Sequence, residues 1–135
     1  MTSDKELFDR AVAVRAQAHA GYSGFKVGAA ILDADGAIWI GCNVENAAYP
    51  LGACAEAGAI SAMVAGGGRR IRRIAIVGGR DELEKCPPCG GCRQRIAEFA
   101  TPETRVVLFE SSGEPCEFEI GALLPLSFAL RDGGQ

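Results

Sequence analysis

Three cysteines carry the clearest chemical signal in this sequence of 135 residues. Cys54 opens the segment CAE, and Cys89 and Cys92 lie in the segment PCGGC at 88–92. Thiolates are good zinc ligands, and three protein ligands leave the fourth tetrahedral position of the metal open for water. An open position is typical of catalytic zinc, which lowers the pKa of a coordinated water from about 15.7 to about 7. We therefore predict that Cys54, Cys89 and Cys92 bind one Zn²⁺ in each chain.

Glu56 stands two residues after Cys54 and is the predicted catalytic residue. Positions two apart on a helix point to different sides, so its carboxylate can reach the activated water without binding the metal. It would accept a proton from that water and deliver protons to a ring nitrogen and to departing ammonia. A Cys-x-Glu segment followed by Pro-Cys-x-x-Cys is the signature of the zinc deaminases. The sequence thus predicts a zinc-dependent hydrolytic deaminase that acts on an aminated ring.

Cys86 leaves an alternative open, because the run CPPCGGC at 86–92 contains two overlapping C-x-x-C units. With Cys54 it could complete a four-cysteine zinc site, which would be closed and structural. An iron–sulfur protein built on the same run is a further alternative. The two prolines after Cys86 favour extended backbone ahead of a helix whose first turn holds Cys89 and Cys92. We therefore leave Cys86 out of the predicted site.

The elements that must position these residues follow from apolar periodicity and turn signals. Helices are predicted over 4–19, 54–65, about 90–99 and, as one short turn, 121–124, and strands over 27–32, 37–44, 74–77, 106–109 and 116–120. Both zinc segments then fall at helix N-termini, where unpaired N–H groups and the positive end of the helix dipole stabilise thiolates. This order favours one α/β sheet with helices packed on its faces.

Other residues of reactive type are predicted to be structural. His19 would lie in the last turn of the first helix, where a partly charged imidazole is favourable. Cys42 and Cys116, in predicted strands, would be small core residues or ordinary thiols. The basic stretch at 69–73 would be a solvated segment that leads into a strand.

Composition disfavours several classes of protein. Hydrophobic residues make up 48% of the chain and charged residues 23%, as in ordinary globular domains. No apolar run is long enough for a membrane span and the first residues lack a signal core, which favours a cytoplasmic protein without a membrane partner. A formal charge of -3 disfavours nucleic acid and favours a small ligand. We expect one catalytic domain over 1–135, with a loose tail from about 130.

Beyond the zinc segments, the sequence resembles the cytidine deaminase family, in its short-chain, three-cysteine, homotetrameric branch. The resemblance covers nearly the whole chain. It is carried by YSGFKVGAA at 22–30, GCNVENAAYPLGACAE at 41–56, PCGGCRQ at 88–94 and LLPLSF at 123–128. It implies a single-domain, three-layer α-β-α fold, in which a five-stranded mixed sheet has helices on both faces. It also implies hydrolysis of cytidine and deoxycytidine to uridine and deoxyuridine with release of ammonia, a step of pyrimidine salvage.

The resemblance also implies substrate contacts. Asn43 and Glu45 would hydrogen-bond the ribose hydroxyls, and Phe25 would pack near the base. The backbone of Ala55, together with Glu56, would bind the polar edge of the pyrimidine.

Two further aromatic residues are implied to work between subunits. Phe128 would reach into the site of a neighbouring subunit and stack on the base. Tyr49 would lie near the subunit boundary beside the substrate. The active site would then be complete only in a homo-oligomer, with a homotetramer expected.

Position 57 departs from the family pattern. Many members of this branch have Arg after CAE, where it can hydrogen-bond the zinc thiolates, whereas this chain has Ala57. Three thiolates and one Zn²⁺ are together anionic, which weakens the metal as a Lewis acid unless a positive group lies nearby. Arg93 and the two helix N-termini are the candidates. Blasticidin deaminases also lack this Arg, so a modified cytosine nucleoside or related aminated heterocycle is the alternative substrate.

Overall fold

The computed structural model describes residues 2–130, so most of the predicted loose tail lies outside the described residues. The helices are α1 (Asp4–Arg15), α2 (Ala55–Ala65), α3 (Gly90–Glu98) and α4 (Ile120–Leu123), with a 3-10 turn η1 (Tyr49–Leu51). The strands are β1 (Lys26–Asp33), β2 (Ile38–Cys42), β3 (Ile71–Gly79), β4 (Ala100–Phe109) and β5 (Pro115–Glu119). All predicted elements are present, with changed bounds.

The five strands form one mixed sheet in the order β2-β1-β3-β4-β5. β1 pairs antiparallel with β2 and β3, and β5 pairs antiparallel with β4. The one parallel pair is β3 with β4, which α3 connects. Parallel neighbours require such a crossover, because the chain must return to the same end of the sheet.

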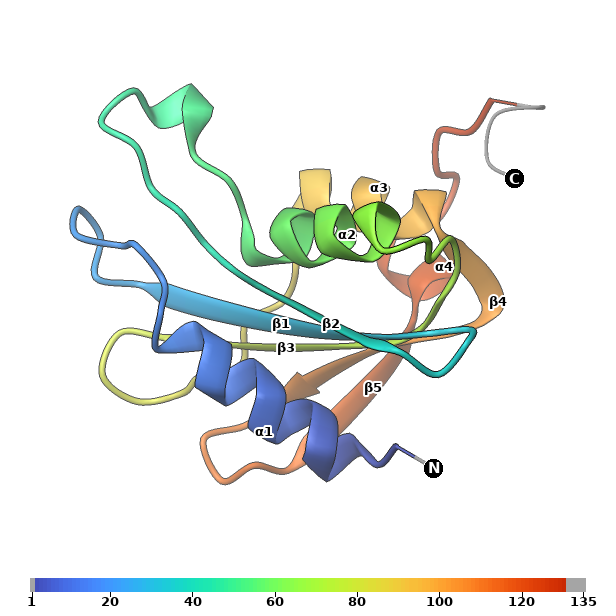
Figure 1. Ribbon diagram of the computed structural model, residues 1–135, viewed down its shortest axis with the longest axis horizontal. Coiled ribbons are helices and arrows are strands. Elements are labelled where there is room, and N and C mark those ends of the chain that lie inside the picture. Colours follow the sequence, from blue (N-terminus) through green and yellow to red (C-terminus); the bar gives the residue numbers. More distant parts are fainter. Residues whose placement is uncertain (1, 131–135) are drawn as a thin grey trace.

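Helices cover both faces of this sheet (Figure 1). On one face, Leu7 and Ala11 of α1 pack against a buried cluster that includes Val77, Val107 and Phe109. On the other face, buried residues of α2 and α3 pack with the opposite sides of the same strands; the cluster includes Ala59, Ile60, Met63, Ile74, Ile76 and Ile96. Successive strand residues face opposite sides, so one sheet serves two cores. The predicted three-layer fold is confirmed.

The first helix is shorter than predicted. Its start is as expected, since the Ser3 side chain caps the amide of Glu6, but the helix ends at Arg15. His19 is therefore not in its last turn. Instead His19 pairs with Val44 in an isolated bridge, in which the His19 amide donates to the Asn43 carbonyl at 3.0 Å. This tertiary pairing overrides the helix propensity of the Ala-rich segment.

Strand β4 is longer than predicted, because it continues through Pro102. Proline has no amide hydrogen for a sheet ladder and is tolerated where pairing is interrupted. The register of β3 with β4 shifts between the pairs Ile71–Ala100 and Arg73–Arg105, and Pro102 lies in this irregularity. Pro102 thus lies in an irregular part of strand β4, where the register shifts.

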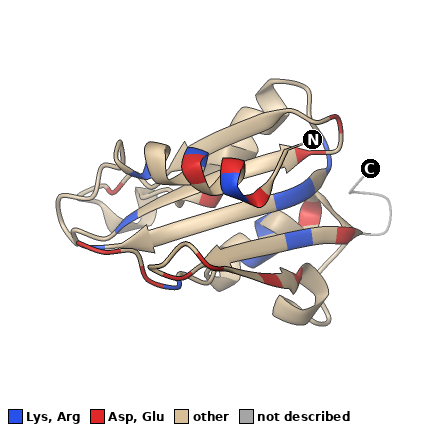
Figure 2. Ribbon diagram, turned by 90° about the horizontal axis from the view of Figure 1, so that it is seen from below, with Lys and Arg blue, Asp and Glu red and all other residues tan. Residues whose placement is uncertain are grey.

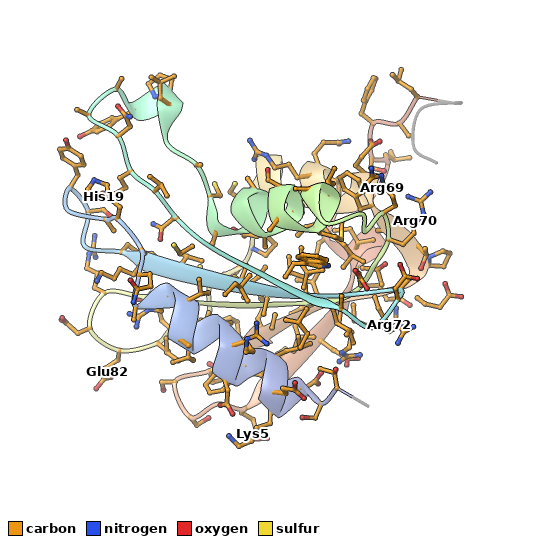
Figure 3. The ribbon with its side chains drawn as sticks, in the orientation of Figure 1. Lys5, His19, Arg69, Arg70, Arg72 and Glu82 are labelled. Atoms are coloured by element: carbon orange, nitrogen blue, oxygen red, sulfur yellow. The ribbon has the colours of Figure 1, made fainter. Side chains whose placement is uncertain are left out.

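Charged residues are spread over the surface, with acidic and basic positions interspersed along the ribbon (Figure 2). Arg73 binds Asp4 at 2.8 Å and also pairs with Glu117, so it joins α1, β3 and β5. Arg69, Arg70 and Arg72 lie at the end of the molecule opposite His19 (Figure 3). Within residues 2–130, no helix is both long and apolar enough to cross a membrane.

Candidate metal centre and active site

The two predicted zinc segments meet at the starts of two neighbouring helices. Cys54 is the N-cap residue of α2 and Cys89 that of α3, while Cys92 lies in the first turn of α3. The three Sγ atoms all lie within 4.8 Å of one another. Zinc–sulfur bonds of about 2.3 Å in a tetrahedron separate the sulfurs by about 3.8 Å. Small side-chain adjustments would therefore let the three thiols hold one zinc ion.

Gly41 in β2 allows α2 to approach the sheet closely. A Cβ atom at this position would lie 2.3 Å from the amide nitrogen of Ala59 and 2.6 Å from the carbonyl oxygen of Ala55. The helix backbone thus rests directly on the strand. Because Cys54 and Glu56 are at the first turn of this helix, the contact fixes their position relative to the sheet.

Burial and backbone hydrogen bonds shift the pKa values of the thiols in opposite directions. Burial raises the pKa of both Cys54 and Cys92 above the ordinary value for a thiol. A hydrogen bond from the backbone amide of Cys92 is the main cause that lowers the pKa of Cys89. Metal binding requires thiolates, so zinc must displace protons from Cys54 and Cys92.

Glu56 is buried beside the thiols, with only 4% of its surface exposed. Burial raises the pKa of its carboxyl group, and the nearby charge of Arg95 is among the groups that oppose this rise. Glu56 also lines the cavity next to the metal centre. A carboxyl group with a raised pKa in such a position can both accept and return a proton near neutral pH.

Cys86 lies near this centre but outside the three-thiol group. Over residues 2–130, Cys54, Cys89 and Cys92 are the one group of at least three possible ligand residues close enough to share an ion. The Cys86 thiol packs on Gly78 of β3, where an added Cβ would lie 2.8 Å from its Sγ. Burial raises the pKa of Cys86 to about 11, so the thiol stays protonated. The geometry favours three ligands and an open fourth position.

Arginines near the centre are arranged differently from the expectation. Arg93 is engaged elsewhere, because its Nε donates to the Pro88 carbonyl at 2.8 Å and its Nη1 to the Leu123 carbonyl at 2.9 Å. Arg95 instead donates from Nη1 to the Cys92 Sγ at 3.6 Å. Sequence reasoning missed Arg95, although its spacing of three residues from Cys92 on a predicted helix places the two on one face.

A cavity of about 500 Å³ opens beside the metal centre. The predicted site residues that line it are Asn43, Glu45, Tyr49, Cys54, Ala55, Glu56 and Cys89. Other residues that line it were not predicted to belong to the site: Tyr22, Ser23, Val27, Val44, Asn46, Gly52, Ala53, Cys86 and Pro87. Tyr22 and Ser23 could have been found from the YSGF segment, whereas Val27 and Pro87 carry no polar signal.

Glu45 and Asn43 organise one wall of the cavity. The Glu45 carboxylate accepts from the amides of Tyr22 at 3.0 Å and Ser23 at 3.1 Å, and also from the Ser23 hydroxyl. The hydrogen bond from the Ser23 side chain is the main cause that lowers the pKa of Glu45. In the Asn43 side chain, Oδ1 accepts from the backbone amide of Val27 at 2.8 Å and Nδ2 donates to the Phe25 carbonyl at 2.9 Å.

The aromatic residues of the predicted site are placed in three different ways. The Phe25 ring lies next to Gly78 and does not line the cavity. Tyr49 lines the cavity, is 77% exposed and contacts Tyr22 edge-to-face, with ring centroids 6.4 Å apart. Phe128 is 71% exposed and does not line the cavity of its own chain. Its carbonyl accepts from Gln94 Nε2 at 2.9 Å.

Three thiols around an open metal position, next to a buried carboxyl group, define the class of hydrolytic zinc deaminases. Comparison with known proteins agrees with this class. The family model for the cytidine and deoxycytidylate deaminase zinc-binding region matches residues 1–109. The chain belongs to this family, as its sequence motifs indicated.

Individual relatives are similar over almost their whole length. The chain is 40% identical over 126 residues to a cytidine deaminase of Halalkalibacterium halodurans, covering 93% of this chain and 94% of the relative. A crystal structure of cytidine deaminase from Burkholderia pseudomallei is 41% identical with a TM-score of 0.86, covering 94% of this chain and 100% of that chain. The corresponding structure from Mycobacterium tuberculosis is 36% identical with a TM-score of 0.81, covering 96% and 100%. The predicted fold and zinc cofactor are thus confirmed.

Proposed function

We propose that this protein catalyses the zinc-dependent hydrolytic deamination of cytidine and deoxycytidine, giving the uracil nucleosides and ammonia. The observation that carries the proposal is the buried carboxyl group of Glu56, which stands beside three convergent thiols and faces a cavity. Similar proteins of several bacteria, named cytidine deaminases, support the choice of substrate. Zinc bound by Cys54, Cys89 and Cys92 would activate a water molecule at neutral pH.

Glu56 would move the protons of this reaction. Its carboxylate accepts a proton from the attacking water and passes it to the ring nitrogen next to the amine-bearing carbon. A second proton, from the added hydroxyl group, then leaves with the amine as ammonia. The side chain is almost completely enclosed, so its carboxyl group is held in place for both transfers.

The wall formed by Asn43 and Glu45 would bind the ribose. Asn43 uses one acceptor position and one N–H on the backbone of neighbouring residues, which leaves one of each for a ligand. Glu45 accepts three hydrogen bonds and retains acceptor capacity. A sugar hydroxyl, which both donates and accepts, matches these remaining positions, while the backbone of Ala55 would meet the pyrimidine edge.

A homo-oligomer, expected to be a tetramer, would complete the site. Tyr49 and Phe128 are highly exposed apolar side chains, and further ones, Leu51, Leu126 and Leu130, lie near them in sequence. The η1 loop and the C-terminal segment both rise on the side of the sheet covered by α2 and α3 (Figure 1). Exposed apolar patches of this kind mark interfaces. Phe128 would thereby reach a neighbouring cavity and stack on the base. All six cysteines are free thiols, in keeping with the reducing cytoplasm in which we expect the enzyme to work.

Purified protein should be assayed for ammonia release from cytidine, deoxycytidine, a blasticidin-type nucleoside and free aminated heterocycles. We expect turnover of the two cytosine nucleosides at one zinc per chain. Turnover of another ring without turnover of cytidine would refute the substrate assignment. Zinc without any turnover would favour a structural metal site instead.

Light scattering and a Phe128→Ala variant test the oligomer. We expect a homo-oligomer in solution and, in the variant, a raised KM for cytidine with zinc content unchanged. A monomer of full activity would contradict the shared site.

A further inference from the structure

A positive charge close to its sulfur atoms would stabilise the three-thiol centre when zinc is bound. Three thiolates with one Zn²⁺ are together anionic, and strong sulfur donors make the metal a weaker Lewis acid. Ala57 has no charge to offer, and the Arg93 donors are committed to the Pro88 and Leu123 carbonyls. The backbone amide of Cys92 serves Cys89. Cys92 is the most buried of the three ligands, and its sulfur needs a donor of its own.

Arg95 provides that donor. It follows Cys92 by three residues on α3, and helical side chains lean toward the N-terminus, so its guanidinium group passes back over the preceding turn. There Nη1 donates to the Cys92 Sγ at 3.6 Å, within the range for a hydrogen bond to sulfur.

Gly91 keeps this path open. A Cβ atom at position 91 would lie 3.2 Å from Nη1 of Arg95, closer than most packing contacts, and 4.0 Å from the Cys89 Sγ. A side chain here would therefore force the guanidinium group to shift from its position beside the thiols. The segment 89–95, from the N-cap of α3 into its second turn, thus holds the two ligands Cys89 and Cys92, a glycine without a side chain and the Arg95 cation.

We propose that Arg95 is a positioning residue of the metal centre, which hydrogen-bonds the Cys92 thiolate and offsets the negative charge of the ligand set. The N–H donor withdraws electron density from the sulfur, so the sulfur becomes a weaker donor and the metal a stronger Lewis acid. Arginine suits this task because it stays protonated at every working pH. The inference rests on the proposed function only for the metal, since it does not depend on which nucleoside is the substrate.

The test compares Arg95→Gln with Arg72→Gln, which removes the same charge elsewhere. Arg72 donates to the Ala34 carbonyl at 2.9 Å and does not line the cavity. In cobalt-substituted Arg95→Gln we expect the sulfur-to-cobalt charge-transfer band at lower energy, because the thiolate has lost its donor. Zinc affinity against a chelator, or kcat, should fall roughly 10- to 100-fold, as for other groups that support a metal ligand. Arg72→Gln should match the wild type in all three measurements.

Arg95→Lys keeps the charge, and we expect it to recover part of the zinc affinity lost in Arg95→Gln. If Arg95→Gln does not fold, Arg95→Met removes the charge with a good helix former and carries the same comparison. An unchanged cobalt spectrum together with unchanged zinc affinity in the folded variant would overturn the proposal. A wild-type protein without cytidine turnover, but with the expected spectral shift in Arg95→Gln, would refute the proposed function and leave the role of Arg95 standing.

Discussion

Replacing Glu56 with Gln tests the proposed chemistry most directly. The substitution keeps the shape of the side chain but removes the carboxyl group that we propose accepts and returns protons. General acid–base catalysis contributes roughly 10²- to 10⁴-fold to a rate. Glu56 is only 4% exposed, so its carboxyl group is held in place beside the three thiols, and we expect the upper part of this range. A loss of about 10³- to 10⁴-fold in kcat corresponds to about 4 to 5.5 kcal/mol of activation free energy.

The assay for this prediction has two readouts. Ammonia release from cytidine gives kcat and KM, and elemental analysis gives zinc per chain. We expect kcat to fall while zinc content stays at the wild-type value, because Glu56 is not one of the three convergent ligands. KM should change less than kcat, since the carboxylate acts mainly on the transition state.

Asp33→Asn provides a matched control, because it also converts a buried carboxylate into an amide. Asp33 is 2% exposed and accepts from the Trp39 indole at 2.7 Å and from the amides of Asp35 and Ala37, away from the cavity. Loss of these charge-assisted bonds should cost roughly 1.5 to 3 kcal/mol in the free energy of unfolding, with kcat near the wild-type value. Turnover by Glu56→Gln within about tenfold of wild type, with zinc in place, would refute the role of Glu56. Zinc loss would instead make it part of the metal site.

Further outcomes follow from the same contacts. Cys86→Ala should retain one zinc per chain and most of its activity; loss of zinc on elemental analysis would show a fourth ligand. Gly41→Ala should lower stability by about 1 to 3 kcal/mol or more and weaken zinc binding, since its Cβ would overlap α2; an unchanged melting temperature would contradict this packing. Zinc affinity should rise with pH, because the raised pKa values of Cys54 and Cys92 oppose thiolate formation; competition with a chelator of known pH dependence measures it. Burial alone would raise the pKa of Asp33, but its hydrogen bonds from Trp39 and the backbone outweigh burial and lower it. The wild type should therefore lose its stability advantage over Asp33→Asn as pH falls below about 4, which urea unfolding at several pH values would detect.

The convergence of the three predicted zinc ligands could be predicted from sequence because their geometry is local. Cys89 and Cys92 share one helix turn, and Cys54 precedes Glu56 at the start of another helix, so helix periodicity fixes most of the arrangement. The prolines after Cys86 indicated, also locally, that this thiol would stay apart. Only the approach of the two helices required the fold, and the motif spacing already implied it.

Arg95 could not be assigned from sequence with the same ease. Arg93 and Arg95 both follow Cys92 closely, and either could in principle reach a thiolate. The choice depends on which carbonyl groups lie beside the helix: Pro88 and Leu123 bind Arg93, and Leu123 is distant in sequence. Which of the two arginines reaches the Cys92 sulfur therefore depends on the tertiary structure.

The end of the first helix was mispredicted for a related reason. The segment after Arg15 is Ala-rich and favours a helix by propensity, but pairing with Val44 gains backbone hydrogen bonds that the sequence does not reveal. Phe128 shows a limit of another kind. Its ring is exposed, and its proposed contact is with the site of a second chain, so the structure of one chain does not determine its role.

The segments around residues 19–25 and 43–45 act as one structural unit, and this unit bears on how variants should be interpreted. The Glu45 amide donates to the His19 carbonyl at 2.7 Å, while its carboxylate holds Tyr22 and Ser23. A Glu45 substitution therefore disturbs a cavity wall as well as a predicted ribose contact, and a raised KM alone would not separate the two effects. The proposed role of Glu56, by contrast, is in the chemistry itself. We therefore expect substitution of Glu56 to lower mainly kcat, and substitution of Glu45 to raise KM and lower stability together.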